Sequence, residues 1–526
     1  MDPFWIVDEK IMDEAIKRLK FPTRFDWGAA TSGYQSEGGY NGPGQPKNNW
    51  YEFETKGLRE TTGRCTDFWN RYTQDLDLAE QIGCNSFRLG IEWARIQPVS
   101  DPSIKTVPNF DESALDHYAD ILNACVECGM RPVLTLFHFT HPYWLGLDAW
   151  LDERLIRKHF IDYVEHSVLG LNKRLIAKGK KPLDIFITIN EPLMVPLASY
   201  IARIFPHVRE GIQLAVKSFV NQLIAHVDAY RTIHSIYKNE KWPTPQVTTN
   251  GWCSMAYETE MVAYDLFLAK TNGIKKSGIH SYIEGRRQCF NKSLFSIDLY
   301  RDHQKIRRLV EYISTHLFRR LFKLEKMERL IDVIYEGSED ERLLDVITFD
   351  YYDPYFGDMF DLGGFPPLKF RTFPWQWRTA ACAFYDFLKI YADAAGDLPI
   401  AIVENGLGYR SRTRRGWARP DGAKRDIVLQ AHLQQLIRGL ADGINITGYF
   451  YWTLYDNYEW GSFEPRFGLL GIDYKNNLER MPHDIIGNNA VGAYKDIISA
   501  FQSHDKNALI NALYSKEHSK ISVESK

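Results

Sequence analysis

The sequence has few of the features that mark secreted, membrane or nucleic-acid-binding proteins. Its seven cysteines are odd in number and thinly spread over 526 residues, which argues against a disulfide framework. No run approaches the ~20 apolar residues that a membrane span needs, and residues 1–20 do not have the basic-then-apolar order of a signal peptide. A formal net charge of −3 gives no reason to expect nucleic acid as a partner. We therefore expect a soluble protein in a reducing, cytoplasmic setting.

The sequence contains many short apolar runs, and segments with helical periodicity separate them. This alternation predicts βαβ units and a parallel sheet. Eight such runs over this length predict an α/β fold, a single (β/α)₈ TIM barrel with long βα loops. An open doubly wound sheet is the rival, but no G-x-G-x-x-G turn follows the first run. The predicted strands are 26–31, 85–91, 132–138, 184–190, 246–251, 345–351, 399–405 and 446–452.

Three segments fall outside the alternation. Residues 1–20 read as a short helical N-terminal extension, with Phe4, Trp5 and Ile6 as apolar anchors. Residues 503–526 are polar and charged, and we expect a C-terminal tail that frays. Residues 21–502 are then the barrel domain, and 283–344 form a basic, helical, insertion-like segment within it.

The basic segment predicts an amphipathic helix. Such a helix normally packs its apolar side on the barrel and leaves its charges in solvent. A basic amphipathic helix can also lie on an anionic membrane, so a weak membrane-surface or glycolipid contact through 300–335 is a second hypothesis. The apolar residues at helical spacing are Ile306, Leu309, Val310, Ile313, Leu317, Leu321 and Leu324.

Two of the predicted strands end in a carboxylate. Glu404 is next to last in "PIAIVEN", and Glu191 follows "DIFITIN", so both lie at the carboxyl-end face if the strands share a barrel. Two carboxylates at a polar opening are the minimal equipment for hydrolysing a glycosidic bond. Spacing alone leaves a divalent-metal site open, although such a site would need more converging oxygen ligands.

These strand ends belong to longer blocks in a familiar order: "FPTRFDWGAATSGYQSEGG", "NSFRLGIEWARIQP", "FHFTHPYWL", "TINEP", "IVENG" and "GYFYWTLYDNYEWGSFEPRFGL". With them the chain resembles the glycoside hydrolase family 1 β-glycosidases from Phe21 to Tyr474. The resemblance implies that Glu191 is the general acid/base and Glu404 the nucleophile. It implies that Arg88 and Tyr352 support Glu404. It also implies a glycone site of Gln35, His138, Asn190, Trp452, Glu459, Trp460 and Phe467.

The resemblance also implies a substrate class. Branches that act on 6-phosphorylated sugars lack the Trp of the Glu459-Trp460 pair and hold phosphate with a Lys-x-Tyr group, which this chain does not offer. A carboxylate near O6 would repel a phosphate dianion. We expect a retaining β-glycosidase for small unphosphorylated β-glycosides, with glucosides preferred over galactosides or fucosides, and with no cofactor or metal. The alternatives are a transglycosylase that uses an alcohol or lipid acceptor, and a non-catalytic barrel that binds carbohydrate or glycolipid.

Two departures from the family pattern stand near the predicted site. His138 is followed by Phe139 and Thr140 where the family commonly has Trp and Asp, which predicts an altered glycone preference. Asp350 stands where the family has Asn in its "NYY" motif. If Asp350 faces the acid/base, like-charge repulsion would raise the pKa of Glu191.

Overall fold

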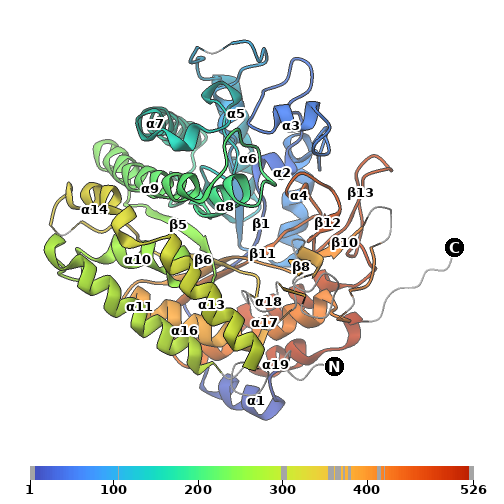
Figure 1. Ribbon diagram of the computed structural model, residues 1–526. Helices are drawn as coiled ribbons and strands as arrows, with labels where there is room; N and C mark the ends of the chain where they lie inside the picture. Colours follow the sequence, from blue (N-terminus) through green and yellow to red (C-terminus); the bar gives the residue numbers. More distant parts are fainter. Residues whose placement is uncertain are drawn as a thin grey trace.

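A computed structural model describes residues 6–519, apart from 105, 298–304, 340, 354–359, 362–368, 371–373, 377–378, 380, 412–415 and 420. Eight parallel strands close into a barrel at its centre (Figure 1). This confirms the predicted fold class, and each barrel strand overlaps one predicted run. The run 446–452 coincides with its strand, and the ends of the other strands differ from the predicted ones by no more than three residues. The strands are β1 (Asp26–Ala30), β2 (Ser86–Gly90), β3 (Arg131–Thr135), β4 (Ile185–Asn190), β5 (Gln246–Trp252), β6 (Ile347–Tyr351), β9 (Ile400–Asn405) and β11 (Ile446–Trp452).

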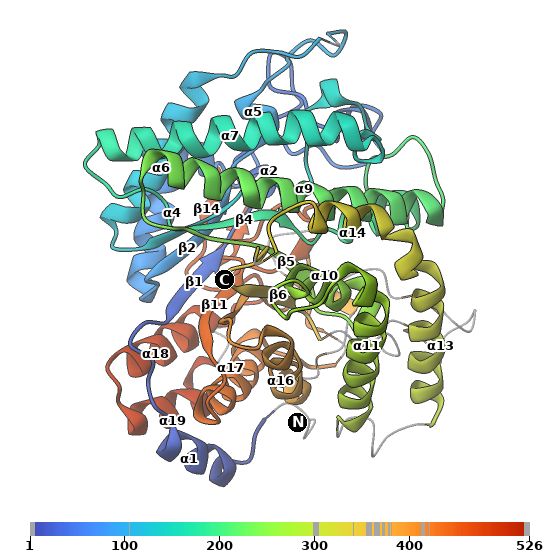
Figure 2. The same ribbon diagram turned by 90° about the vertical axis from the view of Figure 1, so that its left-hand side faces the viewer.

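Helices surround the barrel and cover the outer faces of its strands (Figures 1 and 2). Asp111 and Asp152 cap the helices that follow them by accepting hydrogen bonds from free backbone N–H groups. Gly83 ends another helix with a positive φ of 97°. The outer helices are α4 (Phe68–Ile82), α6 (Glu112–Glu127), α7 (Glu153–Ala177), α9 (Ile212–Glu240), α10 (Met261–Leu268), α14 (Glu328–Tyr335), α16 (Phe384–Ala395), α17 (Arg425–Ala441) and α18 (Ala490–Gln502).

Shorter elements lie in the loops at the strand ends. The helices among them are α2 (Gly33–Ser36), α3 (Tyr51–Thr55), α5 (Trp93–Ile96) and α8 (Met194–Tyr200). The strands form three small antiparallel pairs outside the barrel: β7 (Phe360–Asp361) with β8 (Lys369–Phe370), β10 (Tyr409–Arg410) with β12 (Pro465–Arg466), and β13 (Ile472–Asp473) with β14 (Glu479–Arg480).

The register of the strands brings polar residues to one level near the carboxyl ends. Parallel strands place equivalent positions side by side, so residues from distant segments become neighbours. These residues are buried, so their polar groups must find partners inside the barrel. The register pairs are Ala30 with Arg88 and Trp452, Asn190 with Asn250, and Asp350 with Glu404.

The two ends of the chain differ from expectation. Helix α1 (Glu9–Arg18) forms the predicted N-terminal extension, but Ile6 is exposed and is not an anchor; Phe4 and Trp5 lie outside the described residues. The predicted fraying tail is wrong for α19 (Lys506–Tyr514), whose residues Leu509 and Leu513 are buried. Asp505 caps this helix, and its apolar side packs on α1, α17 and α18.

The basic segment contains α11 (Ile279–Ser296), α13 (Lys305–Leu321) and α14, and α11 and α13 lie at one side of the barrel (Figure 2). The expected packing of α13 is wrong in part. Ile313 and Leu317 remain 56% and 53% exposed. Thr315 is buried instead, and Phe322 just beyond the helix is buried against Phe219 of α9. The side chains of Ile306, Leu309 and Val310 lie outside the described residues.

No helix among the described residues is long and apolar enough to cross a membrane. The seven cysteines are all free thiols. The expectation that they form no disulfide framework is therefore confirmed.

Candidate active site

A pocket opens at the carboxyl ends of the barrel strands and gathers most of the predicted site. Arg88 and Asn190 are not part of its lining; Arg88 donates hydrogen bonds to both Asn190 and Glu404. The pocket is lined by Gln35, His138, Phe139, Glu191, Met194, Trp252, Tyr352, Glu404, Trp452, Glu459, Trp460 and Phe467.

Glu404 is the next-to-last residue of β9 and accepts hydrogen bonds from two donors. Arg88 donates from Nη1 to Glu404 Oε1 at 2.7 Å, and the Tyr352 hydroxyl donates to Oε2 at 3.0 Å. Burial raises the pKa of Glu404, and the guanidinium and the phenol oppose that rise. Burial, and then the charge of Glu404, hold the pKa of Tyr352 well above its usual range, so it stays a donor. The arrangement favours an ionised, fixed carboxylate.

Glu191 follows β4 and faces Glu404 across the pocket. One carboxylate oxygen of each lies within 4.8 Å of the other. Burial raises the pKa of Glu191 well above its usual range, and the charge of Glu404 raises it further. Two neighbouring carboxyls in environments that favour opposite protonation states are what general acid and nucleophile roles require.

The side-chain amides of Asn190 and Asn250 are held in fixed orientations near these carboxyls. Arg88 donates to Asn190 Oδ1, and Asn250 Nδ2 donates to the same oxygen at 2.8 Å. The Asn190 amide nitrogen therefore points the other way, 3.4 Å from His138 Nε2. Burial lowers the pKa of His138 well below its usual range, so the ring is neutral. Its face stacks on Trp452, with ring centroids 5.5 Å apart.

Glu459 and Trp452 form another part of the pocket lining. Trp452 Nε1 donates to Glu459 Oε1 at 2.7 Å, and burial raises the pKa of Glu459 to about 8. The ring of Phe467 meets that of Tyr352 edge-on. Aromatic surface beside hydrogen-bonding groups suits a sugar, which has an apolar C–H face and a rim of hydroxyls. Among the described residues, no Lys or Arg lines this pocket.

The backbone is strained at three positions of the pocket. Phe139, Glu191 and Trp460 have φ values of 69°, 40° and 50°, in the left-handed region that non-glycine residues rarely occupy. Such residues persist where the surrounding structure holds them, and they concentrate at functional sites. The strain at these three positions agrees with a functional role for this pocket.

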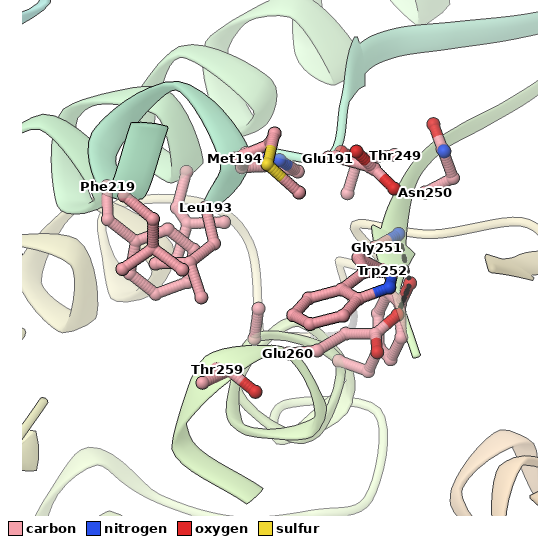
Figure 3. Close-up of a pocket in the computed structure, with 15 residues that line it drawn as sticks. Glu191, Leu193, Met194, Phe219, Thr249, Asn250, Gly251, Trp252, Thr259 and Glu260 are labelled. Carbon is pink, nitrogen blue, oxygen red and sulfur yellow. Dashed lines mark hydrogen bonds between the residues drawn. The ribbon is translucent and has the colours of Figure 1, made fainter. Parts of the chain in front are cut away.

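Several residues of the site were not predicted. Asn250, Trp252, Met194 and Glu260 all lie around Glu191. Asn250 and Trp252 belong to the end of β5, so the strand-end rule that selected Glu191 could have found them. Glu260 carries no such signal, because its burial comes from the packing of the loop before α10 (Figure 3).

The comparisons with known proteins agree with this geometry. Over 484 residues the chain is 25% identical to a 6-phospho-beta-galactosidase from Staphylococcus epidermidis, covering 88% of this chain and 96% of the relative. It is 26% identical over 477 residues to a 1,4-beta-D-glucan glucohydrolase from Thermotoga neapolitana, with the same coverage. A solved beta-glucosidase from Thermotoga maritima, in complex with castanospermine, superposes with a TM-score of 0.66 at 21% identity, covering 91% and 98% of the two chains.

The family model for glycosyl hydrolase family 1 matches residues 17–270 and 366–499, which is more than half of the chain. The unmatched stretch between them holds the basic segment, Asp350 and Tyr352. The matched stretches hold both Glu191 and Glu404. The chain is a glycoside hydrolase and belongs to glycosyl hydrolase family 1.

Proposed function

We propose that the chain is a retaining β-glycosidase for unphosphorylated β-glycosides, and that β-glucosides are its preferred substrates. The observation that carries the proposal is the spacing of Glu191 and Glu404, whose oxygens lie within 4.8 Å. Retaining enzymes hold their carboxyls about 5 Å apart, whereas inverting enzymes leave about 6.5–9.5 Å for a water molecule.

In the first step Glu404 attacks the anomeric carbon. The bond from that carbon to the leaving oxygen breaks, and Glu191 donates its proton to that oxygen. The product is a glycosyl ester of Glu404 and a free alcohol. Arg88 and Tyr352 keep Glu404 ionised and aimed before the attack.

In the second step the roles of Glu191 reverse. Glu191 is now ionised, and it takes a proton from a water molecule that attacks the anomeric carbon. The ester bond breaks, the sugar leaves with retained configuration, and both carboxyls return to their starting states. No step uses a metal ion or cofactor.

An unphosphorylated sugar fits the wall around Glu459 better than a phosphorylated one. A phosphate dianion needs cationic partners, and no Lys or Arg is among the described residues that line the pocket. A dianion there would instead meet a buried carboxyl at Glu459. This favours the glycone class of the Thermotoga relative over that of the staphylococcal one.

Transglycosylation is the second candidate function, because the same two carboxyls would serve an acceptor alcohol in place of water. The exposed apolar side of α13 is the observation that favours a hydrophobic acceptor. A non-catalytic binding barrel has no such support, since both carboxyls are present and Arg88 and Tyr352 oppose the rise in pKa at Glu404 alone among the two by direct hydrogen bonds. Product analysis with and without an added alcohol separates hydrolysis from transfer.

The test uses a 2-deoxy-2-fluoro-β-glucoside with a dinitrophenolate leaving group. We expect the intact mass to increase by one fluoroglycosyl group, with the label mapping to Glu404 and absent from Glu404→Gln. In the same assay, an aryl β-glucoside should be cleaved and its 6-phosphate left intact. No label together with no cleavage of any aryl β-glycoside would contradict the proposal. Faster cleavage of the 6-phosphate would contradict only the substrate class.

We also propose a weak contact between α13 and an anionic lipid surface. Tyr312, Ile313 and Leu317 are each more than half exposed, and the exposed Arg319 and Arg320 follow them. Arg319 lies 3.5 Å from Glu284, so Arg320 is the less compensated cation of the two. Exposed apolar residues beside arginines are the pattern that binds the headgroup boundary.

Co-sedimentation with phosphatidylserine vesicles tests this contact. We expect the Arg319→Gln/Arg320→Gln double variant to sediment less than the wild type, because each cation near such a surface contributes about 1 kcal/mol. The matched control is Lys173→Gln/Lys178→Gln at the C-terminal end of α7, which removes two exposed cations elsewhere. Equal recovery of all three proteins would rule the contact out.

A further inference from the structure

A third carboxyl stands beside the candidate acid/base. Asp350 of β6 is fully buried, and it offers a carboxylate oxygen within 4.8 Å of oxygens of both Glu191 and Glu404. Only one guanidinium among the described residues, that of Arg88, lies near the three carboxyls. It donates its hydrogen bonds there to Glu404 and Asn190. The distance from Arg88 Nη1 to Asp350 Oδ1 is 3.8 Å, which is too long for a hydrogen bond.

A chain of donors fixes which oxygen of Asp350 is satisfied. An arginine can only donate, so Asn190 Oδ1 must accept from Arg88. Asn250 must then present its nitrogen to that same oxygen. The second hydrogen of that nitrogen points at Asp350 Oδ2. Asp350 Oδ1 is left buried and has no donor among the described residues.

An ionised Asp350 would therefore be a buried charge with one neutral hydrogen bond. Such a charge is too costly to persist, and the group takes up a proton instead. Asp350 is in hydrogen-bonding contact with Glu191, and carboxylate oxygens of the two lie within 4.8 Å of one another. Two carboxyls in contact ionise together only at high cost, so one proton is retained between them.

We propose that Asp350 and Glu191 share a proton in the resting enzyme, and that Asp350 is a positioning residue that holds this proton on the acid/base. The inference rests on the proposed function. The proposed acid/base, Glu191, thereby gains a partner, Asp350, that keeps Glu191 protonated at alkaline pH. Burial, then Glu404 and Glu191, raise the pKa of Asp350 well above its usual range, in agreement with a neutral group.

The other ionisable groups around Asp350 do not supply that proton. Burial raises the pKa values of the neighbouring phenols and thiol far above neutrality, so they stay neutral. The groups that face Asp350 are Arg88 of β2, Glu191 after β4, Cys253 after β5, Glu260 and Tyr264 around α10, Tyr352 after β6 and Glu404 of β9.

Glu260 is another buried carboxyl near Asp350. The Tyr264 hydroxyl accepts from Gly251 N–H at 2.8 Å and has one proton, which Thr348 O takes at 2.7 Å. Its 3.0 Å contact with Glu260 Oε1 then needs a proton on Glu260. Burial raises the pKa of Glu260 to about 8. Figure 3 shows Glu260 against Gly251 and Trp252, on the pocket behind Glu191.

The experiment compares pH profiles of kcat/KM for an aryl β-glucoside with a poor leaving group. We expect Asp350→Asn to move the alkaline limb to lower pH by about one unit or more, the scale at which paired sites interact. Glu258→Gln is the matched control and should leave that limb in place, because Glu258 is a buried carboxyl that pairs with Arg287 and lies outside the pocket. An unmoved limb in Asp350→Asn, in an enzyme that still labels at Glu404, overturns the inference and leaves the proposed function intact.

A second measurement does not depend on turnover. The infrared difference between wild type and Asp350→Asn at neutral pH should show the loss of the broad, shifted carboxyl band of a shared proton and the gain of an ordinary protonated carboxyl band from Glu191. Loss of only a carboxylate band would overturn the shared proton. A wild type that neither labels nor hydrolyses would instead mean that the proposed function has failed. Thermal unfolding of each variant verifies that it is folded before either comparison.

Discussion

Replacing Glu191 by glutamine is expected to lower kcat/KM for a β-glucoside with a poor leaving group by about 10²–10⁴-fold, the usual contribution of a positioned general acid. A dinitrophenyl glucoside should lose far less in its first step, because dinitrophenolate departs without a proton. The second step still needs a base, so the glycosyl-enzyme should accumulate. A burst of dinitrophenolate followed by a slow steady state is the expected time course.

The matched control for this variant is Glu258→Gln. Glu258 is also a buried carboxyl with a raised pKa, but it pairs with Arg287 and lies outside the pocket. It should leave the dependence on leaving group unchanged. An equal loss for good and poor leaving groups in Glu191→Gln would contradict the acid/base assignment.

Replacing Arg88 by methionine is expected to be among the most destabilising changes at the site. Arg88 is fully buried, and its removal leaves Glu404 buried without a counter-charge. Breaking a buried ion pair from one side costs about 3–5 kcal/mol, measurable as a lower midpoint of urea unfolding. The pKa of Glu404 should also rise, because the guanidinium now lowers it. The acid limb of the activity profile should therefore move to higher pH.

Arg480→Met separates these two effects. Arg480 pairs with buried Asp75 at 2.8 Å, in a part of the fold that does not line the pocket. This variant should lose comparable stability and keep the acid limb of the wild type. If Arg88→Met loses stability and keeps that limb as well, Arg88 is only a structural residue.

Most of the barrel could be predicted because its strands are buried on both faces. A run such as Ile185–Asn190 has only Thr188 as a polar residue before its last position, and the loop that follows starts where the polarity changes. The C-terminal helix was missed although Asp505, Leu509 and Leu513 carry a cap and an apolar spacing. The many charged residues around this helix in the sequence led to the prediction of a frayed tail. The orientation of α13 could not be read, because apolar residues occur on two of its faces.

The candidate site could be predicted only in part, for a related reason. Strand-end carboxylates such as Glu191 and Glu404 can be recognised from their positions at the ends of predicted strands. The proton partner Asp350 depends on the register between β6 and β9, and Glu260 depends on a loop that folds back onto Gly251. Neither arrangement is local in sequence, so no pattern along the chain could reveal it.

The closure of the fold also sets a constraint on its synthesis. Strand β1 pairs with β11, and the hydroxyl of Tyr514 in α19 donates to the Val7 carbonyl across 507 residues. At bacterial to eukaryotic translation speeds the N-terminal strand waits on the order of 25–100 s for these partners. During that interval β1 presents an unpaired edge, which is a template for aggregation. We expect the nascent chain to depend on a chaperone that shields residues 26–30 until the last helix leaves the ribosome.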